Sequence, residues 1–277
     1  MKARVKINQR TKTLILIGLA IFYLAGVAIW GISGRDAALT TDFSRKNLTP
    51  CLSYLFGTDW LGRDMLARTI TGLSISIVIG VCAAGVSAVI AGLLGVAAAT
   101  MGKRVDAAIT WLIDLIMGIP HILLLILISY AAGKGLVGVI LGVSLTHWTS
   151  LARIIRAEVL QLKESVYIRT TRKLGHSNWE IAKKHMLPHL LPQFLVGLVL
   201  LFPHAILHEA SITFLGFGLS TEQPAIGVIL SESMKYLVTG KWWLALFPGA
   251  MLVLTVMLFD LLGECLRKLT DPGSAHR

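Results

Sequence analysis

The sequence predicts an all-α polytopic membrane protein with six transmembrane helices. Of its 277 residues, 55% are hydrophobic and 15% are charged, and the mean hydropathy of +0.73 exceeds that of a soluble domain. A helix needs about 20 mainly apolar residues to cross a bilayer. Six stretches approach or exceed that length, at roughly 13–34, 74–100, 107–132, 135–152, 190–214 and 243–265. An even number of spans places both termini on one side of the membrane.

Residues 1–34 are expected to form a cytoplasmic N-terminus and the first span. The apolar run from Leu14 to Ile32 is longer than the 7–15 residues of a cleaved signal sequence, and no A-x-A site follows it. We therefore expect an uncleaved signal anchor.

Residues 35–73 form a polar segment that is expected to be extracytoplasmic. It contains FGTDWLGRDMLART, in which Thr58 or Asp59 is a candidate helix N-cap. The apolar residues Leu61, Met65 and Ile70 would then share one face. The pattern predicts a short amphipathic helix at the outer interface.

Residues 74–266 are expected to form a five-helix core. Its second and fourth spans carry small residues that allow close helix packing, among them Gly138 and Gly142 at GxxxG spacing. Proline removes a backbone hydrogen bond, so it favours a kink within a span. The prolines in question are Pro120, Pro203 and Pro248.

Residues 153–189 are too charged to lie in hydrocarbon, yet their pattern predicts helices. We expect a short helix over 167–174, a left-handed cap at Gly175 and a second helix over 178–186 that begins at Ser177 or Asn178. Pro188 and Pro192 would restart the chain toward the fifth span. A simple connection between spans needs only a few residues, so this helix-turn-helix unit predicts a soluble partner.

The distribution of charge sets the expected orientation. The net charge is +11, and 18 of the 26 basic residues fall on one side if the N-terminus is cytoplasmic, with the tail at 267–277 on that same side. This asymmetry is typical of membrane topology. Nucleic-acid binding is disfavoured, because no soluble domain gathers the basic residues on one surface. The three cysteines indicate neither a disulfide framework nor a metal cluster.

Several motifs occur in the order found in one family. They are FGTD with LGRD at 56–64, Arg104-Val105-Asp106, the stretch from Asp114 to Pro120, LGFG at 215–218, FPG at 247–249, and LGE at 262–264 with Asp271-Pro272. The segment ESVYIRTTRKLG is similar to a family loop of consensus Glu-Ala-Ala, three residues, Gly, nine residues, Ile-x-Leu-Pro. Gly175, Leu187 and Pro188 match, whereas Arg169-Thr170-Thr171 and His185 depart from it. The chain thus resembles permease subunits of the dipeptide, oligopeptide and nickel branch of binding-protein-dependent ABC importers.

The resemblance implies a type I ABC importer permease fold in the cytoplasmic (inner) membrane, with a coupling-helix loop. It implies a heterodimer with a second permease, two cytoplasmic ATPases and an extracytoplasmic binding protein. No Walker A motif occurs here, so ATP and Mg would bind the partner ATPases and this chain would be neither an enzyme nor the holder of a cofactor. The implied ATPase-coupling residues are Arg169, Thr170, Thr171, Gly175, Leu187 and Pro188.

Histidines within the predicted spans suggest the cargo. His204 and His208 lie at i, i+4 and form a candidate metal pair, because ionisable residues in spans tend to be functional and imidazole suits nickel, copper and zinc. Hydrogen bonding between helices is the alternative role. The family comparison favours nickel, since nickel-type members share this His pair and His147-Trp148, although Glu209-Ala210-Ser211 resembles peptide-type members. Candidate residues of the substrate path are His121, His204, His208 and Glu209.

Three interpretations of the function therefore stay open. An importer of nickel, free or chelated, is the first, and an importer of di- or oligopeptides is the alternative. An intramembrane metalloprotease is a remote third, because Ala205 stands where H-E-x-x-H zinc sites place the base. A channel or scaffold would leave the helix-turn-helix unit unexplained.

Overall fold

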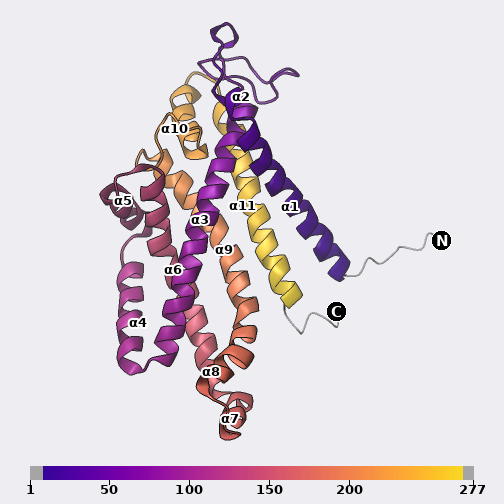
Figure 1. The fold of residues 1–277 in the computed structure, drawn as a ribbon. Coiled ribbons are helices and arrows are strands. Elements are labelled where there is room, and N and C mark those ends of the chain that lie inside the picture. The colour runs from indigo at the N-terminus through magenta and orange to yellow at the C-terminus, as the bar shows by residue number, and fades with distance from the viewer. Residues whose placement is uncertain (1–8, 271–277) are drawn as a thin grey trace, which may run out of the picture.

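The structure is a computed structural model that describes residues 9–270, and within them it is a helical bundle with only two isolated β-bridges. α3 lies at the centre and packs against α1, α6 and α9 (Figure 1). The α-helices are α1 (Gln9–Ser33), α2 (Arg35–Leu39), α3 (Met65–Thr100), α4 (Lys103–Gly118), α5 (His121–Ala131), α6 (Gly135–Glu164), α7 (Val166–Lys173), α8 (Asn178–Ile181), α9 (Leu187–Phe214), α10 (Ile226–Leu237) and α11 (Trp243–Thr270).

The predicted membrane fold is confirmed. Five helices within residues 9–270 are long and apolar enough to cross a bilayer, and α4 with α5 supplies a sixth span if the bent pair counts as one. Segment 40–64 and α10 lie at one end of the bundle, while α7 and α8 lie at the other end, where α1 begins and α11 ends (Figure 1). Asp271-Pro272 and most of the predicted N-terminal and C-terminal tails lie outside the described residues.

Pro120 breaks the third predicted span. The residue before a proline is forced toward extended geometry, and Ile119 adopts φ −90° and ψ 136°. The axes of α4 and α5 consequently differ by 99°. Pro203 and Pro248, in contrast, lie inside α9 and α11 without ending either helix.

The outer segment corrects the prediction of a short amphipathic helix that begins at Thr58 or Asp59. Asp64 is the N-cap instead: its side chain accepts a hydrogen bond from the Leu66 amide at 2.8 Å, and the helix that follows is α3 itself. Asp59 closes a turn, because its carboxylate accepts from the amides of Leu61 and Arg63 at 2.8 and 3.0 Å. The second span therefore begins at Met65 rather than near residue 74.

The helix-turn-helix unit has the predicted outline. α7 ends before Gly175, whose φ of +89° is left-handed, and the Ser177 hydroxyl accepts from the Glu180 amide at 3.2 Å as α8 begins. The expected restart at Pro188 and Pro192 is wrong. A π-helical turn at Ala182–Met186 leads directly into α9, and Pro188 occupies the first turn of α9, where its missing amide hydrogen costs little.

Small residues form packing faces, as predicted. A Cβ atom at Gly138 would collide with the backbone carbonyl of Ser129, so α6 approaches α5 closely at this point. The Ser129 hydroxyl in turn donates to the Phe217 carbonyl at 3.1 Å, and the Gly135 amide donates to the Gly218 carbonyl at the same distance. These bonds fix the α5–α6 turn against the end of α9.

α10 was not expected from the sequence. Its run of apolar residues is too short for a span, and its buried Ile229 packs with Met65, Trp243 and Leu244. α10 therefore joins the start of α3 to the start of α11 at the end of the bundle that carries segment 40–64 (Figure 1).

Candidate functional site

Three histidines from three helices meet inside the bundle. His121 is the first residue of α5, His147 lies in α6 and His208 lies in α9. Their ring centroids are 4.5 Å apart for His121 and His208, 4.8 Å for His121 and His147, and 5.0 Å for His147 and His208. One ring nitrogen from each lies within 4.8 Å of the others, a grouping that suits one metal ion. We call these residues the histidine cluster.

The proton positions in the cluster follow from hydrogen bonds. Nδ1 of His147 lies 3.0 Å from the carbonyl oxygen of Val143, one helical turn earlier, and 3.1 Å from the Thr146 hydroxyl, which itself donates to the Gly142 carbonyl. A carbonyl only accepts, so the Val143 contact assigns the hydrogen to Nδ1 and the lone pair to Nε2. The Nε2 atoms of His147 and His121 are both buried without a hydrogen-bond partner among the described residues. Two nitrogens in the cluster thus have no hydrogen-bond partner within residues 9–270.

The helix break brings His121 into this group. In a straight third span, the residues after Pro120 would continue along the α4 axis. The 99° turn instead starts α5 at His121, beside α6 and α9. Broken helices commonly flank binding sites in transporters.

The structure groups the predicted site residues differently from the sequence. His121 and His208 belong to the cluster, whereas His204 is exposed and is not one of the three grouped residues, although it lies near enough to interact electrostatically with them. His147 lies in the first half of α6, since that helix continues to Glu164. The i, i+4 spacing identified His208 but could not indicate which helices lie beside it.

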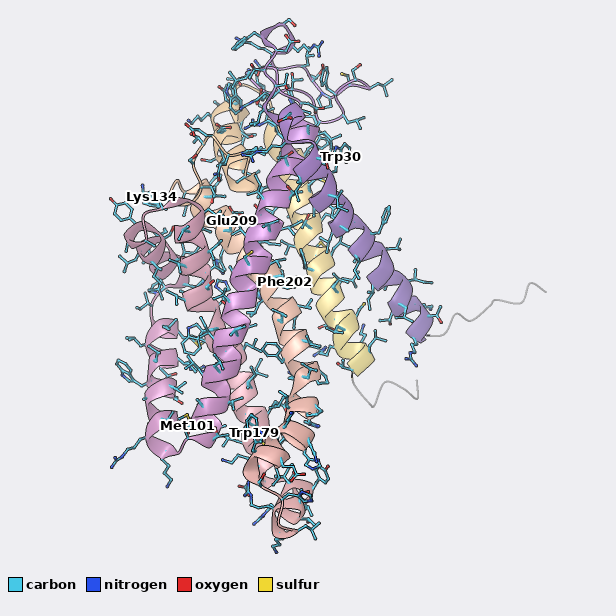
Figure 2. The ribbon with its side chains drawn as sticks, in the orientation of Figure 1. Trp30, Met101, Lys134, Trp179, Phe202 and Glu209 are labelled. Carbon is cyan, nitrogen blue, oxygen red and sulfur yellow. The ribbon has the colours of Figure 1, made fainter. Side chains whose placement is uncertain are left out.

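Glu209, also a candidate residue of the substrate path, is buried in this structure. Its side chain is 0% exposed and accepts a hydrogen bond from the Thr213 hydroxyl at 2.9 Å (Figure 2). The residue follows His208 in α9, and successive helical residues face different directions, so it is not part of the grouped residues. Its place in the substrate path stays a prediction.

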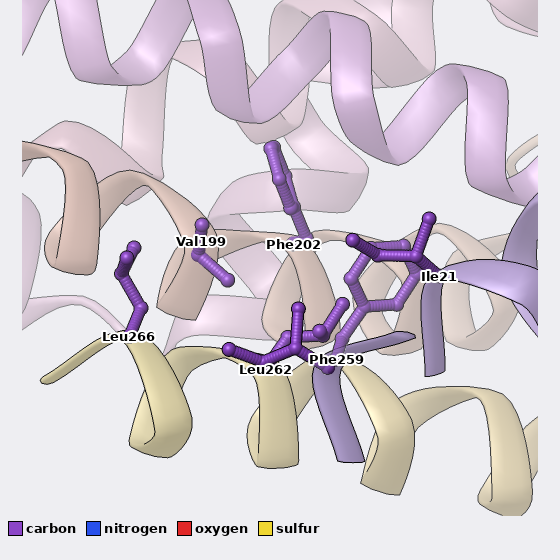
Figure 3. Close-up of a pocket in the computed structure, with 7 residues that line it drawn as sticks. Ile21, Val199, Phe202, Phe259, Leu262 and Leu266 are labelled. Atoms are coloured by element: carbon purple, nitrogen blue, oxygen red, sulfur yellow. The ribbon is translucent and has the colours of Figure 1, made fainter. Parts of the chain in front are cut away.

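A polar cavity of about 540 Å³ lies at the end of the bundle that carries α10, between the α5–α6 turn, the end of α9 and α10. Both signs of charge line it, with Lys134 on the turn (Figure 2) and Glu232 and Lys235 on α10. A second cavity, about 220 Å³, is lined only by apolar side chains of α1, α9 and α11 (Figure 3). Because nothing polar faces it, this second cavity offers no contact to a charged cargo.

The helix-turn-helix unit presents apolar side chains at the end of the bundle. Ile168 and Thr171 face inward, and the Thr171 hydroxyl donates to the Tyr167 carbonyl at 2.9 Å. The remaining predicted coupling residues, Arg169, Thr170, Gly175, Leu187 and Pro188, are exposed. Sequence analysis missed the large exposed apolar side chains beside them, which are Val166 at 80%, Leu174 at 75% and Trp179 at 77%.

Comparisons with known proteins agree with this architecture. Residues 88–275 match the family described as "Binding-protein-dependent transport system inner membrane component". The chain is 32% identical over 269 residues to the dipeptide transport system permease protein DppC of Bacillus subtilis, which covers 97% of this chain and 83% of that protein. It is 33% identical over 265 residues to the oligopeptide transport system permease protein OppC of the same organism, at 95% and 87% coverage.

A third relative is the glutathione transport system permease protein GsiD of Pectobacterium atrosepticum, 31% identical over 95% of this chain and 88% of that protein. Among solved structures, an inward-facing form of the MetNI methionine ABC transporter superposes with a TM-score of 0.62, at 18% identity, over 75% of this chain and 98% of that chain. That likeness concerns the fold alone. A permease of this family works with ATPase and binding-protein partners and is not itself an enzyme, so the metalloprotease interpretation is wrong. The chain belongs to the family of inner-membrane permease components of binding-protein-dependent ABC importers, within its peptide and oligopeptide branch.

Proposed function

We propose that this chain is one of two permease subunits that carry di- or oligopeptides inward across the cytoplasmic membrane. The observation that carries this proposal is the identity of 32–33% with DppC and OppC over at least 95% of the chain. Nickel permeases are not among the relatives described above. The peptide interpretation, which was the alternative at the level of sequence, therefore takes precedence.

The outer cavity supports a peptide cargo. A short peptide is a zwitterion, and Lys134 and Lys235 face the same space as Glu232. The volume of about 540 Å³ falls within the roughly 300–1,000 Å³ of small-molecule sites. In this proposal, the cavity receives the peptide from the binding protein before it enters the span region.

The helix-turn-helix unit is the proposed ATPase contact. Large exposed apolar side chains indicate a protein partner, and Val166 at the start of α7, Leu174 at its end and Trp179 in α8 are all exposed. α7 and α8 would sit in a groove of one ATPase and follow it when ATP closes the ATPase dimer. Since the π-helical turn joins this unit to α9 without a break, the motion would reach the spans as a rigid-body movement that gives alternating access.

Orientation follows from the same proposal. With 153–189 in the cytoplasm, residues 1–34 begin and 267–277 end on the cytoplasmic side, and the segment before Met65 faces outward, as the basic residues predict. The five-helix core then begins at Met65, where α3 starts, and ends near residue 266. The partner permease would be a different but homologous chain.

Nickel, free or chelated, is a second candidate cargo, and the histidine cluster is the observation that favours it. Imidazole nitrogen binds nickel, copper and zinc well. The three histidines supply more donor atoms than the His204 and His208 pair that the sequence suggested.

Transport by the reconstituted complex tests the proposal. The chain, co-expressed with the partner permease and ATPases encoded beside it, would be placed in liposomes with the binding protein. We expect ATP-dependent uptake of a labelled dipeptide and no hydrolysis of it. Uptake of ⁶³Ni²⁺ without any peptide uptake would reverse the order of the two candidates. Peptide uptake without an ATPase, or with the 153–189 segment accessible to protease from outside, would contradict the proposal.

A further inference from the structure

We propose that His121, His147 and His208 bind one divalent transition-metal ion, and that the ion arrives with an anionic ligand supplied by the cargo. This inference rests on the proposed function, because the anionic ligand would be the carboxylate and amino groups of a short peptide. It deepens that function by making a metal–peptide complex a cargo of this permease.

The first argument is the supply of donors. Three imidazoles from three separate helices converge, with one nitrogen from each within 4.8 Å of the others. A buried histidine in a span usually finds a hydrogen-bond partner. Here the Nε2 atoms of His121 and His147 are buried and have none among the described residues.

The second argument is that His147 already has the form of a metal ligand. Metal-binding histidines usually donate their other ring N–H to a carbonyl or carboxylate, which fixes the tautomer and the ring orientation. The Val143 carbonyl performs this role at 3.0 Å from Nδ1. The lone pair on Nε2 is then available to a metal, and the ring is held in place by its own helix.

The third argument concerns distance. Two neighbouring nitrogens bound to one Ni²⁺ ion at about 2.1 Å are about 3.0 Å apart in square-planar or tetragonal geometry. The donors in the cluster, which lie within 4.8 Å, would have to approach by at most about 1.8 Å. Rotation of the partly exposed rings of His121 and His208 supplies such a shift, while the 7% exposed His147 stays in place.

The fourth argument is charge balance, and it points to a chelated ion. Three neutral imidazoles do not offset the charge of a divalent ion. Holding the full charge of that ion in a region shielded from water has a high free-energy cost. No carboxylate belongs to the grouped residues: Oε1 of Glu209, the residue after His208, accepts from Thr213, and its Oε2 is buried with no hydrogen-bond partner among the described residues. The N-terminus of α5, at His121, adds positive potential. A carboxylate that travels with the ion removes this cost, whereas a bare ion does not.

Binding of Ni²⁺ to the intact importer tests the inference. The complex in lipid nanodiscs would be titrated with Ni²⁺ alone and with Ni²⁺ plus glycylglycine, and the bound metal would be measured by equilibrium dialysis. X-ray absorption would count imidazole nitrogens around it. We expect one ion per chain, three imidazole ligands, and binding at least tenfold tighter with glycylglycine present.

Single alanine substitutions test which histidines bind the metal. His147→Ala and His121→Ala should each weaken Ni²⁺–glycylglycine binding at least tenfold. His189→Ala, an exposed histidine on the same helix as His208, is the matched control and should not change it. Unchanged binding in His147→Ala, or equal affinity for Ni²⁺ with and without glycylglycine, would overturn the proposal.

A metal-free dipeptide separates this inference from the proposed function. Uptake of that dipeptide with EDTA present tests the peptide permease alone. Normal uptake together with no Ni²⁺ bound at the cluster would overturn the metal site and leave the peptide function standing. Metal bound at the cluster with no peptide uptake would overturn the peptide function and leave the metal site standing.

Discussion

The carboxylate of Asp59 and the guanidinium of Arg68 form an ion pair of 2.7 Å in the interior of the outer end of the bundle. Asp59 is 0% exposed and Arg68 is 1% exposed. The other side of the guanidinium reaches Glu232 on α10 at 3.0 Å, so the pair joins the outer segment to both α3 and α10. The GTD motif thus supplies, through Asp59, an anion for a buried arginine.

Asp59→Ala should destabilise the protein by about 3–5 kcal/mol, because it leaves a buried guanidinium with only one of its two carboxylates. The thermal unfolding midpoint of the purified subunit would measure the loss. Glu264→Ala is the control, since its pair with Arg267 at 3.2 Å is exposed and such pairs contribute about 0–1 kcal/mol. Equal midpoints for the two variants would contradict the buried role of Asp59.

Asp106 and Arg156 should couple α4 to α6. Two hydrogen bonds, of 2.5 and 2.7 Å, link the carboxylate to Nε and the second terminal nitrogen of the guanidinium. We expect a double-mutant cycle of Asp106→Ala and Arg156→Ala to give a coupling free energy of about 0.5–3 kcal/mol. The exchanged pair Asp106→Arg with Arg156→Asp should recover part of the stability lost in either single replacement. A cycle in which the two single losses simply add would show that the residues act independently.

Gly138→Leu should displace α5 from α6. A Cβ atom at Gly138 would meet the backbone carbonyl of Ser129, which cannot rotate away as a flexible side chain can. Overpacking of this kind costs about 1–3 kcal/mol, and a shift of α5 would also move His121. Thermal unfolding would measure the first effect and Ni²⁺–glycylglycine binding the second. Gly18→Leu in α1, where no atom lies within 4 Å of the built Cβ, should change neither.

Gly175→Val should uncouple ATP use from uptake. The φ of +89° at this position is unfavourable for a residue with a side chain, at about 1–2 kcal/mol, although space around it is open. The expected result is normal membrane insertion and assembly with reduced ATP-driven uptake, since the turn between α7 and α8 would change shape.

Gly102→Val is the matched control for this experiment. Gly102 has a similar φ of +94° and open surroundings, but it lies in the α3–α4 turn, outside the proposed ATPase contact. Full uptake by the Gly175 variant, or an equal loss in both variants, would argue against a special role for the coupling turn.

The sequence by itself determined the features that depend on local spacing and composition. The lengths of the apolar runs predicted the spans, because a helix needs about 20 apolar residues to cross a bilayer, whatever its neighbours are. The Gly175 cap and the helices around it followed from local turn chemistry. His208 was predicted as a site residue because an ionisable residue within a span usually has a function.

Only the tertiary structure decided which side chains meet. Asp59 was expected to start a helix, and it instead neutralises Arg68, nine residues later, together with the distant Glu232. His147 lies beside His121 and His208 because the bend at Pro120 turns α5 toward α6 and α9. Glu209 is fully buried and is not part of that cluster, although it directly follows His208. Such contacts depend on the bend, rotation and neighbours of whole helices, which long-range packing fixes and which spacing along the chain does not encode.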